Sequence, residues 1–222
     1  MNKKNLLNEL NKASFNVNKR FKKPNHFPES ESVLNTMQSL IEQAKYEDAL
    51  DVINGHRQNK SNAIERYPKL LIAEGIALIA LNRTQQALTT LHNACVTYEK
   101  RLKDDSKNES WRRNLSAVKS NMSACYILEK NYQASERSAL ISREWHCNWH
   151  GPHINLFTTY LRMNDTKSLD KSIKEMASSW PEWNTDVLMM SHLHGDKDLI
   201  SDTDLVGIVD RLNSLGYVSD QV

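Results

Sequence analysis

Two stretches of the chain can be aligned residue by residue, and this internal repeat restricts the fold more than any other feature. The stretches are 75–87, GIALIALNRTQQA, and 123–135, SACYILEKNYQAS. Each begins with a small residue, continues with apolar residues at helical spacing, passes through a polar turn and ends at a small residue that begins the next helix. Self-similarity of this kind is typical of helix pairs stacked on one another. The repeat therefore predicts an all-α protein built from helix–turn–helix units.

The composition agrees with a helical protein. Of the 222 residues, 39% are hydrophobic and 25% are charged, while six glycines and five prolines are few for a fold with many tight β-turns. Three cysteines without paired spacing predict a reducing compartment. The chain also lacks the apolar stretch of a signal peptide and the roughly 20 apolar residues of a membrane span. We therefore expect a cytoplasmic protein with no membrane span.

The chain is predicted to contain three regions. Residues 1–29 form a basic N-terminal arm, 30–180 a helical repeat domain and 181–222 C-terminal capping helices. The repeat domain begins near Ser30, and its first pair of helices turns at 43–48. The later pairs are predicted at 67–81 with 84–103, at 111–129 with 132–146 and at 152–163 with 166–178. In the last region, Ser201 or Thr203 is expected to cap a final helix that ends at Gly216.

These units resemble the tetratricopeptide repeat, whose pattern is W-x2-L-G-x2-Y…A-x3-F…P over about 34 residues. The resemblance covers about residues 30–180. In the second unit, the consensus Gly, Ala, Phe and following Ala positions hold Gly75, Ala87, Leu91 and Ala94. The resemblance implies a right-handed α-solenoid of about four helix pairs, ended by a C-terminal capping helix.

The repeats are degenerate. Equivalent second-helix positions, at Ala49, Ala87, Ser135 and Leu169, are separated by 38, 48 and 34 residues. The long middle interval must hold an extended helix or a loop around 103–109. In the fourth unit Phe157 and Leu169 replace the small consensus residues, so we expect its two helices to lie further apart.

The family resemblance also implies a binding site. In tetratricopeptide repeats, the first helix of each pair lines a concave face that binds partner peptides. Transferring its contact positions gives a groove with an apolar centre, in which Asn121, Asn155 and Arg162 would set the register of the bound segment. The predicted groove residues are Leu34, Gln38, Ile72, Ile76, Ile79, Asn121, Ala124, Ile127, Leu128, Asn155, Thr158 and Arg162. Two other interpretations stay open: these residues form the core of a closed array, or the ends of the chain cover them.

Two classes of function suit such a groove. The first is a non-enzymatic adaptor that holds a partner segment, and it needs no cofactor. The second is a secretion or assembly chaperone that shields a client protein. The family's Lys, Asn and Arg clamp for a C-terminal carboxylate is missing, so an acidic chaperone tail is disfavoured as the partner. The identity of the partner and any self-association are left open.

Three segments are weaker candidates for chemistry. His146, Cys147, His150 and His153 are ligands that suit zinc, but packing by Trp145 and Trp149 is the preferred interpretation. The segment 192–196, HLHGD, begins a dinuclear metal motif, but Lys197 stands where that motif needs a histidine. The basic arm has the charges to contact nucleic acid, although no nucleic-acid motif is present. Since phosphate loops, G-x-S-x-G and H-E-x-x-H are also missing, we predict no enzyme and no metal site.

Overall fold

The computed structural model describes residues 28–59, 67–146, 149–179 and 201–217. Within these ranges the chain forms nine α-helices and no strand, which confirms the all-α class. No helix in this part of the chain has both the length and the apolar character that crossing a membrane requires. The helices are α2 (Pro28–Glu42), α3 (Tyr46–Asn59), α5 (Lys69–Ala80), α6 (Thr84–Asp104), α7 (Glu109–Leu128), α8 (Tyr132–Trp145), α9 (His150–Arg162), α10 (Thr166–Ser179) and α12 (Asp202–Ser214).

The chain divides into two compact units, Met1–Tyr67 and Pro68–Val222. In the first unit α2 packs against α3, and Ser30 Oγ lies 3.3 Å from His56 Nε2. Helix α3 begins at Tyr46, inside the turn predicted at 43–48. Nearly all of the predicted basic arm lies outside the described residues.

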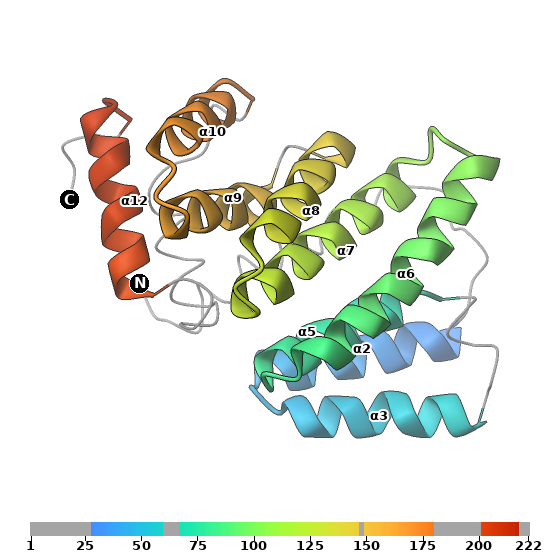
Figure 1. Ribbon diagram of the computed structural model, residues 1–222. Helices are drawn as coiled ribbons and strands as arrows, with labels where there is room; N and C mark the ends of the chain where they lie inside the picture. The colour runs from blue at the N-terminus through green and yellow to red at the C-terminus, as the bar shows by residue number, and fades with distance from the viewer. Residues whose placement is uncertain (1–27, 60–66, 147–148, 180–200, 218–222) are drawn as a thin grey trace. The chain divides into compact units, whose positions relative to one another are not determined.

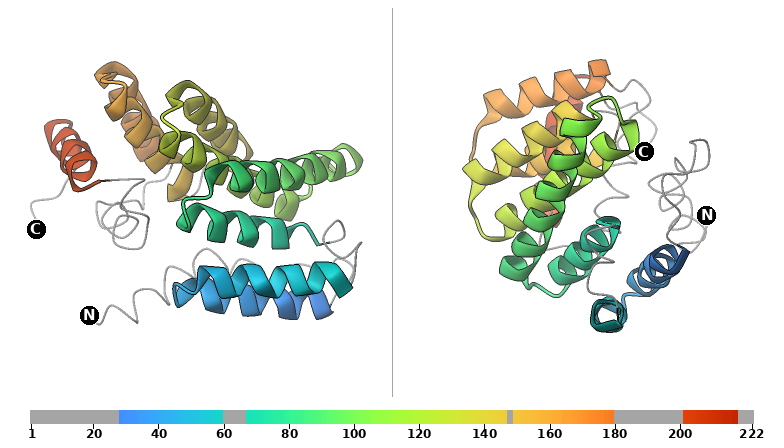
Figure 2. Two further views of the ribbon diagram at one scale, coloured as in Figure 1. Left: turned by 60° about the horizontal axis from the view of Figure 1, so that its bottom comes forward. Right: turned by 90° about the vertical axis from the view of Figure 1, so that its right-hand side faces the viewer.

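The second unit consists of helices that pack in chain order. Each helix from α5 to α10 contacts the next one, and α7 also contacts both α5 and α9. Figures 1 and 2 show α5 with α6, α7 with α8 and α9 with α10 as pairs joined by short turns. Residues Lys69–Trp145 therefore fold as two adjacent helix hairpins, at the positions that the sequence repeat predicted. Helix α12 packs against α9.

Four hairpin turns in the described residues share one backbone conformation. Ala44, Asn82, Lys130 and Asn164 have φ between 56° and 57°, in the left-handed region. The next residue in each turn donates its N–H to the carbonyl oxygen five residues earlier, which closes a Schellman motif. These bonds are Lys45 to Leu40 (2.9 Å), Arg83 to Leu78 (2.8 Å), Asn131 to Tyr126 (2.8 Å) and Asp165 to Tyr160 (2.9 Å). The left-handed residues follow one another at 38, 48 and 34 residues, the spacings predicted for the repeat.

Longer helices account for the 48-residue interval between the second and third turns. Helix α6 has 21 residues and α7 has 20, and only Asp105–Asn108 connect them. The side chain of Asn108 caps α7 by accepting the backbone N–H of Trp111 at 3.1 Å. Of the two predicted explanations for the interval, the extended helix is therefore correct.

A hydrophobic core joins α8, α9, α10 and α12. Phe157 and Leu169, whose bulk was expected to separate α9 from α10, are 0% and 1% exposed within it. Their bulk therefore fills the space between these helices and the neighbours that cover them. The buried members of this core are Ala139, Ile154, Leu156, Phe157, Tyr160, Leu169, Ile173, Met176, Ile208 and Leu212.

The contact between α5 and α6 gives a test of this packing. A Cβ at Gly75 would lie 2.6 Å from Leu91 Cδ2. We therefore expect Gly75→Ala to lower the free energy of unfolding by about 1–3 kcal/mol, although alanine favours a helix more than glycine does. At Gly55, within α3, a Cβ would meet no atom within 4 Å. Gly55→Ala is the matched control, and it should raise the free energy of unfolding by about 0.5–1 kcal/mol.

Both free energies are measured by urea unfolding followed by circular dichroism. Stabilisation of the protein by both substitutions would contradict the close approach of α5 and α6.

Candidate functional site

The predicted groove residues lie on the first helices of the hairpins. Leu34 and Gln38 are on α2 in the first unit, and the other ten are in the second unit. Helix α5 carries Ile72, Ile76 and Ile79, α7 carries Asn121, Ala124, Ile127 and Leu128, and α9 carries Asn155, Thr158 and Arg162. Since α7 contacts both α5 and α9, the structure brings these ten residues onto three neighbouring helices.

Half of the predicted set is buried and does not present a surface. Ile127 and Thr158 have no exposed area at all, so these positions belong to the interior in this structure. Their burial agrees with the open interpretation in which these residues belong to the core. The buried members are Leu34, Ile79, Ala124, Ile127, Asn155 and Thr158.

Two of the polar residues expected to fix a partner's register bond within the chain instead. Asn155 Nδ2 donates to the backbone oxygen of Ser120 at 2.8 Å and to its Oγ at 3.2 Å. Arg162 forms an ion pair with Asp204 of α12, with 2.7 Å between Nη2 and Oδ2. The third, Asn121, is partly exposed on α7.

Four predicted residues of the second unit are partly exposed on two helices in contact. Ile72 and Ile76 lie one turn apart on α5, and Asn121 and Leu128 lie two turns apart on α7. Residues at these spacings share a side of a helix. We name Ile72, Ile76, Asn121 and Leu128 the α5–α7 face. It combines three apolar side chains with one amide, which suits contact with an apolar segment rather than bond-making chemistry.

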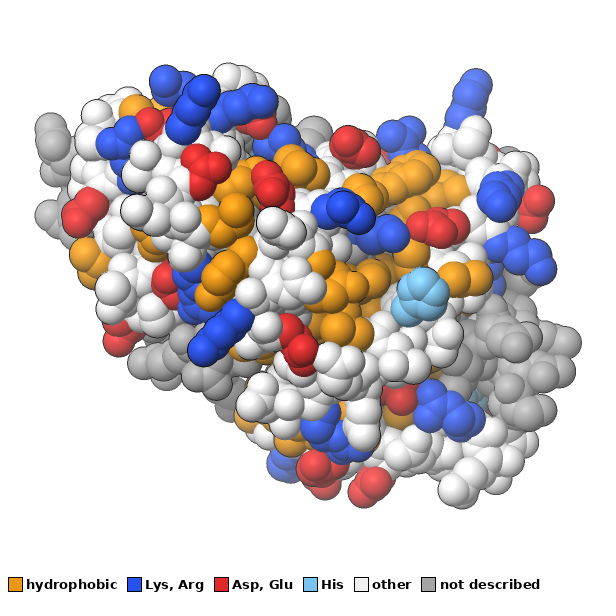
Figure 3. All heavy atoms as spheres, in the orientation of Figure 1, with side chains coloured by type: hydrophobic (Ala, Val, Ile, Leu, Met, Phe, Trp, Pro, Cys, Tyr) orange, Lys and Arg blue, Asp and Glu red, His pale blue; other side chains and the backbone are white. Residues whose placement is uncertain are grey.

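Apolar side chains also gather on another part of this unit. Figure 3 shows apolar side chains gathered over the region of α6 to α8, among lysines, arginines and acids. The most exposed large apolar residue of α6 is Val96, at 51%. It lies on the second helix of its pair, whereas the α5–α7 face is formed by first helices.

Buried hydroxyl groups join three helices of the second unit. Ser123 Oγ on α7 lies 2.8 Å from Ser135 Oγ on α8, which in turn lies 2.8 Å from Thr159 Oγ1 on α9. Nearer the other end of α7, Ser116 Oγ lies 3.0 Å from Ser142 Oγ. The repeat assigned Ser123 and Ser135 to small consensus positions, but their hydrogen bonds were not predicted. The sequence did contain a signal for these bonds, because both small positions are occupied by serine, whose side chain carries a hydroxyl group.

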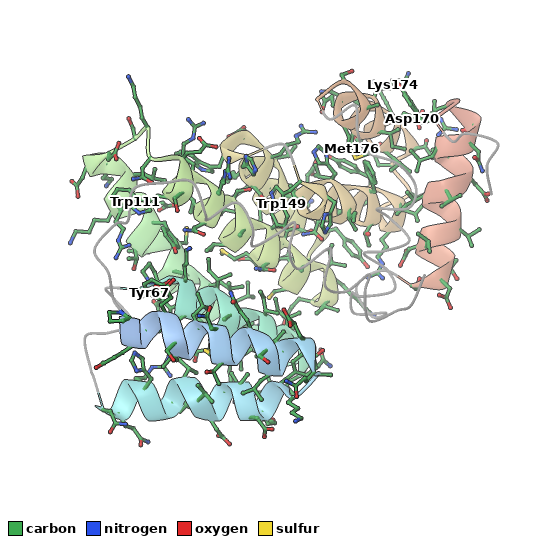
Figure 4. The ribbon with its side chains drawn as sticks, turned by 180° about the vertical axis from the view of Figure 1, so that it is seen from behind. Tyr67, Trp111, Trp149, Asp170, Lys174 and Met176 are labelled. Carbon is green, nitrogen blue, oxygen red and sulfur yellow. The ribbon has the colours of Figure 1, made fainter. Side chains whose placement is uncertain are left out.

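The histidine-rich junction between α8 and α9 packs against α7. Trp149 Nε1 donates to Ser116 Oγ at 3.0 Å, and the guanidinium of Arg112 lies 5.7 Å from the ring centre of Trp145. These contacts agree with the predicted packing role of the two tryptophans; Figure 4 labels Trp149 at the start of α9. Burial, followed by the charge of Arg113, lowers the pKa of His146, and burial lowers that of His150.

Among the described residues, no three His, Cys, Asp or Glu side chains are placed to hold one ion. Cys147 and the segment 192–196 lie outside those residues, so the structure does not test them.

The two described cysteines are buried and carry no disulfide. Cys95 Sγ donates to Glu99 Oε1 at 3.0 Å, and the same oxygen lies 3.2 Å from Lys119 Nζ. Burial and the bond to Glu99 raise the pKa of Cys95 to about 11, although Lys119 opposes the shift. Burial and the charge of Glu129 raise the pKa of Cys125 to about 12. Both groups are therefore held as thiols, and neither is suited to act as a nucleophile.

Comparisons with protein-family models, with curated proteins and with solved structures gave no match. The tetratricopeptide resemblance therefore stays a prediction that is carried by the residues and turns of this chain.

The thiol environments predict slow alkylation. In a Cys147→Ser variant at pH 8, folded Cys95 and Cys125 should react with iodoacetamide at least about 100-fold more slowly than in 8 M urea, because the thiolate is the reacting form and a raised pKa removes it. Mass spectrometry of each tryptic peptide gives the two rates. Equal rates in the folded and unfolded protein would contradict the buried, protonated state.

Proposed function

We propose that this chain is a non-enzymatic adaptor with a tetratricopeptide-like array of helix hairpins, which holds a segment of a partner protein on the first helices of its pairs. The observation that carries the proposal is the α5–α7 face, where Ile72, Ile76 and Leu128 stay partly exposed on two helices in contact. The recurrence of one left-handed turn at the repeat spacings supports the array.

The chemistry of the α5–α7 face defines the partner segment. Ile72 and Ile76 present one apolar strip along α5, so the partner must offer apolar side chains at matching positions. Asn121 has an amide that can donate and accept hydrogen bonds, which suits a backbone or polar group of the segment. An amphipathic segment that lays its apolar side on a helical surface meets both requirements.

The adaptor role and its compartment have separate support. Cys95 and Cys125 are held protonated, which disfavours thiol catalysis by either residue. Both are unpaired, as is usual where the environment is reducing. We therefore place the adaptor in the cytoplasm.

The proposal is tested by site-specific photo-crosslinking. A photoreactive phenylalanine replaces Ile76 on α5 in one variant and Val96 on α6 in the other, and each is expressed in the native host. We expect the Ile76 variant to yield a discrete crosslinked protein and the Val96 variant to yield none, because only the first lies on the α5–α7 face.

A second pair of variants controls for folding. In the chain without the photoreactive residue, Ile72→Ser with Ile76→Ser should reduce co-purification of the protein identified by crosslinking at least about tenfold, while Val96→Ser should leave it unchanged. The same crosslinked proteins from positions 76 and 96, or undiminished recovery by a folded double variant, would refute the adaptor proposal.

A further inference from the structure

Helix α12 packs against the rest of the second unit mainly through one apolar side. Ile208 and Leu212 are fully buried in the core that also contains residues of α9 and α10, and Leu205 and Leu215 pack against it. Val206, on the opposite side, is 59% exposed. Figure 1 shows α12, in red, beside α9 and α10. This is the arrangement of an amphipathic helix that packs on its neighbours through one side.

Two ion pairs of opposite direction fix the orientation of α12. Near its start, Asp204 accepts from Arg162 of α9, and near its end Arg211 donates to Asp170 of α10. Figure 4 shows Asp170 on the part of α10 nearest to α12. A helix docked in the reverse direction would place each charge against a like charge. The surface is therefore selective for an acid at the first turn and a base at the last.

A close approach fixes the register of α12. A Cβ at Gly207 would lie 3.1 and 3.2 Å from the two methyl carbons of Leu161 on α9, which is tighter than ordinary contact. A glycine in a helix interior costs about 1 kcal/mol relative to alanine, so its presence here is explained by this contact rather than by helix formation.

The ends of α12 are satisfied within residues 201–217. At the N-terminus, Ser201 and Asp204 form a capping box, with Ser201 Oγ accepting from Asp204 N at 3.2 Å and Asp204 Oδ2 accepting from Ser201 N at 2.9 Å. At the other end, Gly216 has φ of +77° and Tyr217 N donates to Leu212 O at 3.0 Å. The helix needs no neighbour to complete its own backbone bonds.

We infer that the surface of α9 and α10 around Leu161, Arg162 and Asp170 is a binding site for an amphipathic helix, which α12 occupies within the same chain. A partner helix with the pattern of α12 displaces it. That pattern is an acid, a small residue, an apolar residue and a base at the positions of Asp204, Gly207, Ile208 and Arg211. This inference rests on the proposed function only because the displacing helix belongs to a partner; the site is separate from the α5–α7 face.

The first test uses the unaltered chain. If α12 detaches, the amides of Leu205–Leu215 exchange hydrogen for deuterium at least about 100-fold faster than those of Leu115–Cys125 in α7. The synthetic peptide 201–217, added in excess, should accelerate this exchange further by competing for the surface. Protection of α12 equal to that of α7, unchanged by the peptide, would overturn the proposal even if no variant folds.

The second test measures binding between separate molecules. Ile208→Asp in the full chain places a charge in the core and should release α12. Fluorescein-labelled peptide 201–217 should then bind this variant at least about tenfold more tightly than the unaltered chain, as measured by anisotropy. Equal binding to both, or no binding to a variant that keeps its helical circular dichroism, would overturn the proposal. The proposal would also be overturned if the Ile208→Asp variant dimerises and does not bind the peptide.

Matched peptides test the register and the direction. Gly207→Val should weaken peptide binding at least about tenfold although valine favours a helix more than glycine, whereas Val206→Ala should leave it unchanged. The Arg211→Asp peptide should bind poorly to the Ile208→Asp receptor, and Asp170→Arg in that receptor should restore it. Equal affinity of all these peptides for the receptor would show that an apolar helix adheres to it without a defined site.

These peptide results are independent of the α5–α7 face. A receptor that also carries Ile72→Ser and Ile76→Ser should bind peptide 201–217 normally. If crosslinking at Ile76 fails but peptide 201–217 binds as expected, the adaptor role of the α5–α7 face is rejected and the helix site is retained. If crosslinking succeeds but the peptide does not bind, the helix site is rejected and the adaptor role is retained.

Discussion

The hairpins depend on a single residue that is held in the left-handed conformation two positions after the end of the first helix of each pair. This conformation reverses the chain within a few residues, and the Schellman bonds satisfy carbonyl groups at the end of the helix. For a residue other than glycine it costs about 1–2 kcal/mol. Asparagine tolerates it best, as at Asn82 and Asn164, but Ala44 and Lys130 have no local reason to adopt it. At these two turns the packing of the paired helices, more than the turn residues, determines the reversal.

Close pairing also explains why so many buried positions in the second unit are small and hydroxylic. Small side chains let α7, α8 and α9 approach, but a buried hydroxyl without a partner costs about 1–3 kcal/mol. Ser123, Ser135 and Thr159 solve this by bonding to one another across the three helices. Each hydroxyl is satisfied only in one register, so these bonds specify the relative positions of the helices as well as stabilise them.

The sequence predicted the hairpins because helix periodicity and turns are local properties, and the bounds of α5 to α10 fall within a few residues of the expected ranges. It identified the exposed residues less well. The helical pattern predicted both Ile127 and Leu128 as groove residues. In the structure Ile127 is fully buried, whereas Leu128 is partly exposed. That difference depends on which helices pack on α7. The ion pair of Arg162 with Asp204 joins residues that are 42 positions apart, and no local pattern indicates such a pairing.

The first helices of the hairpins are therefore not equivalent surfaces. Helix α9 contacts α7, α8, α10 and α12, and every residue from Pro152 to Tyr160 is buried. A helix that is enclosed on all sides presents no face to a partner. On α5, Ile72 and Ile76 keep part of their area exposed, although they occupy the same kind of repeat position. Contact with another protein thus requires no rearrangement at α5, whereas at α9 it requires that α12 leave first.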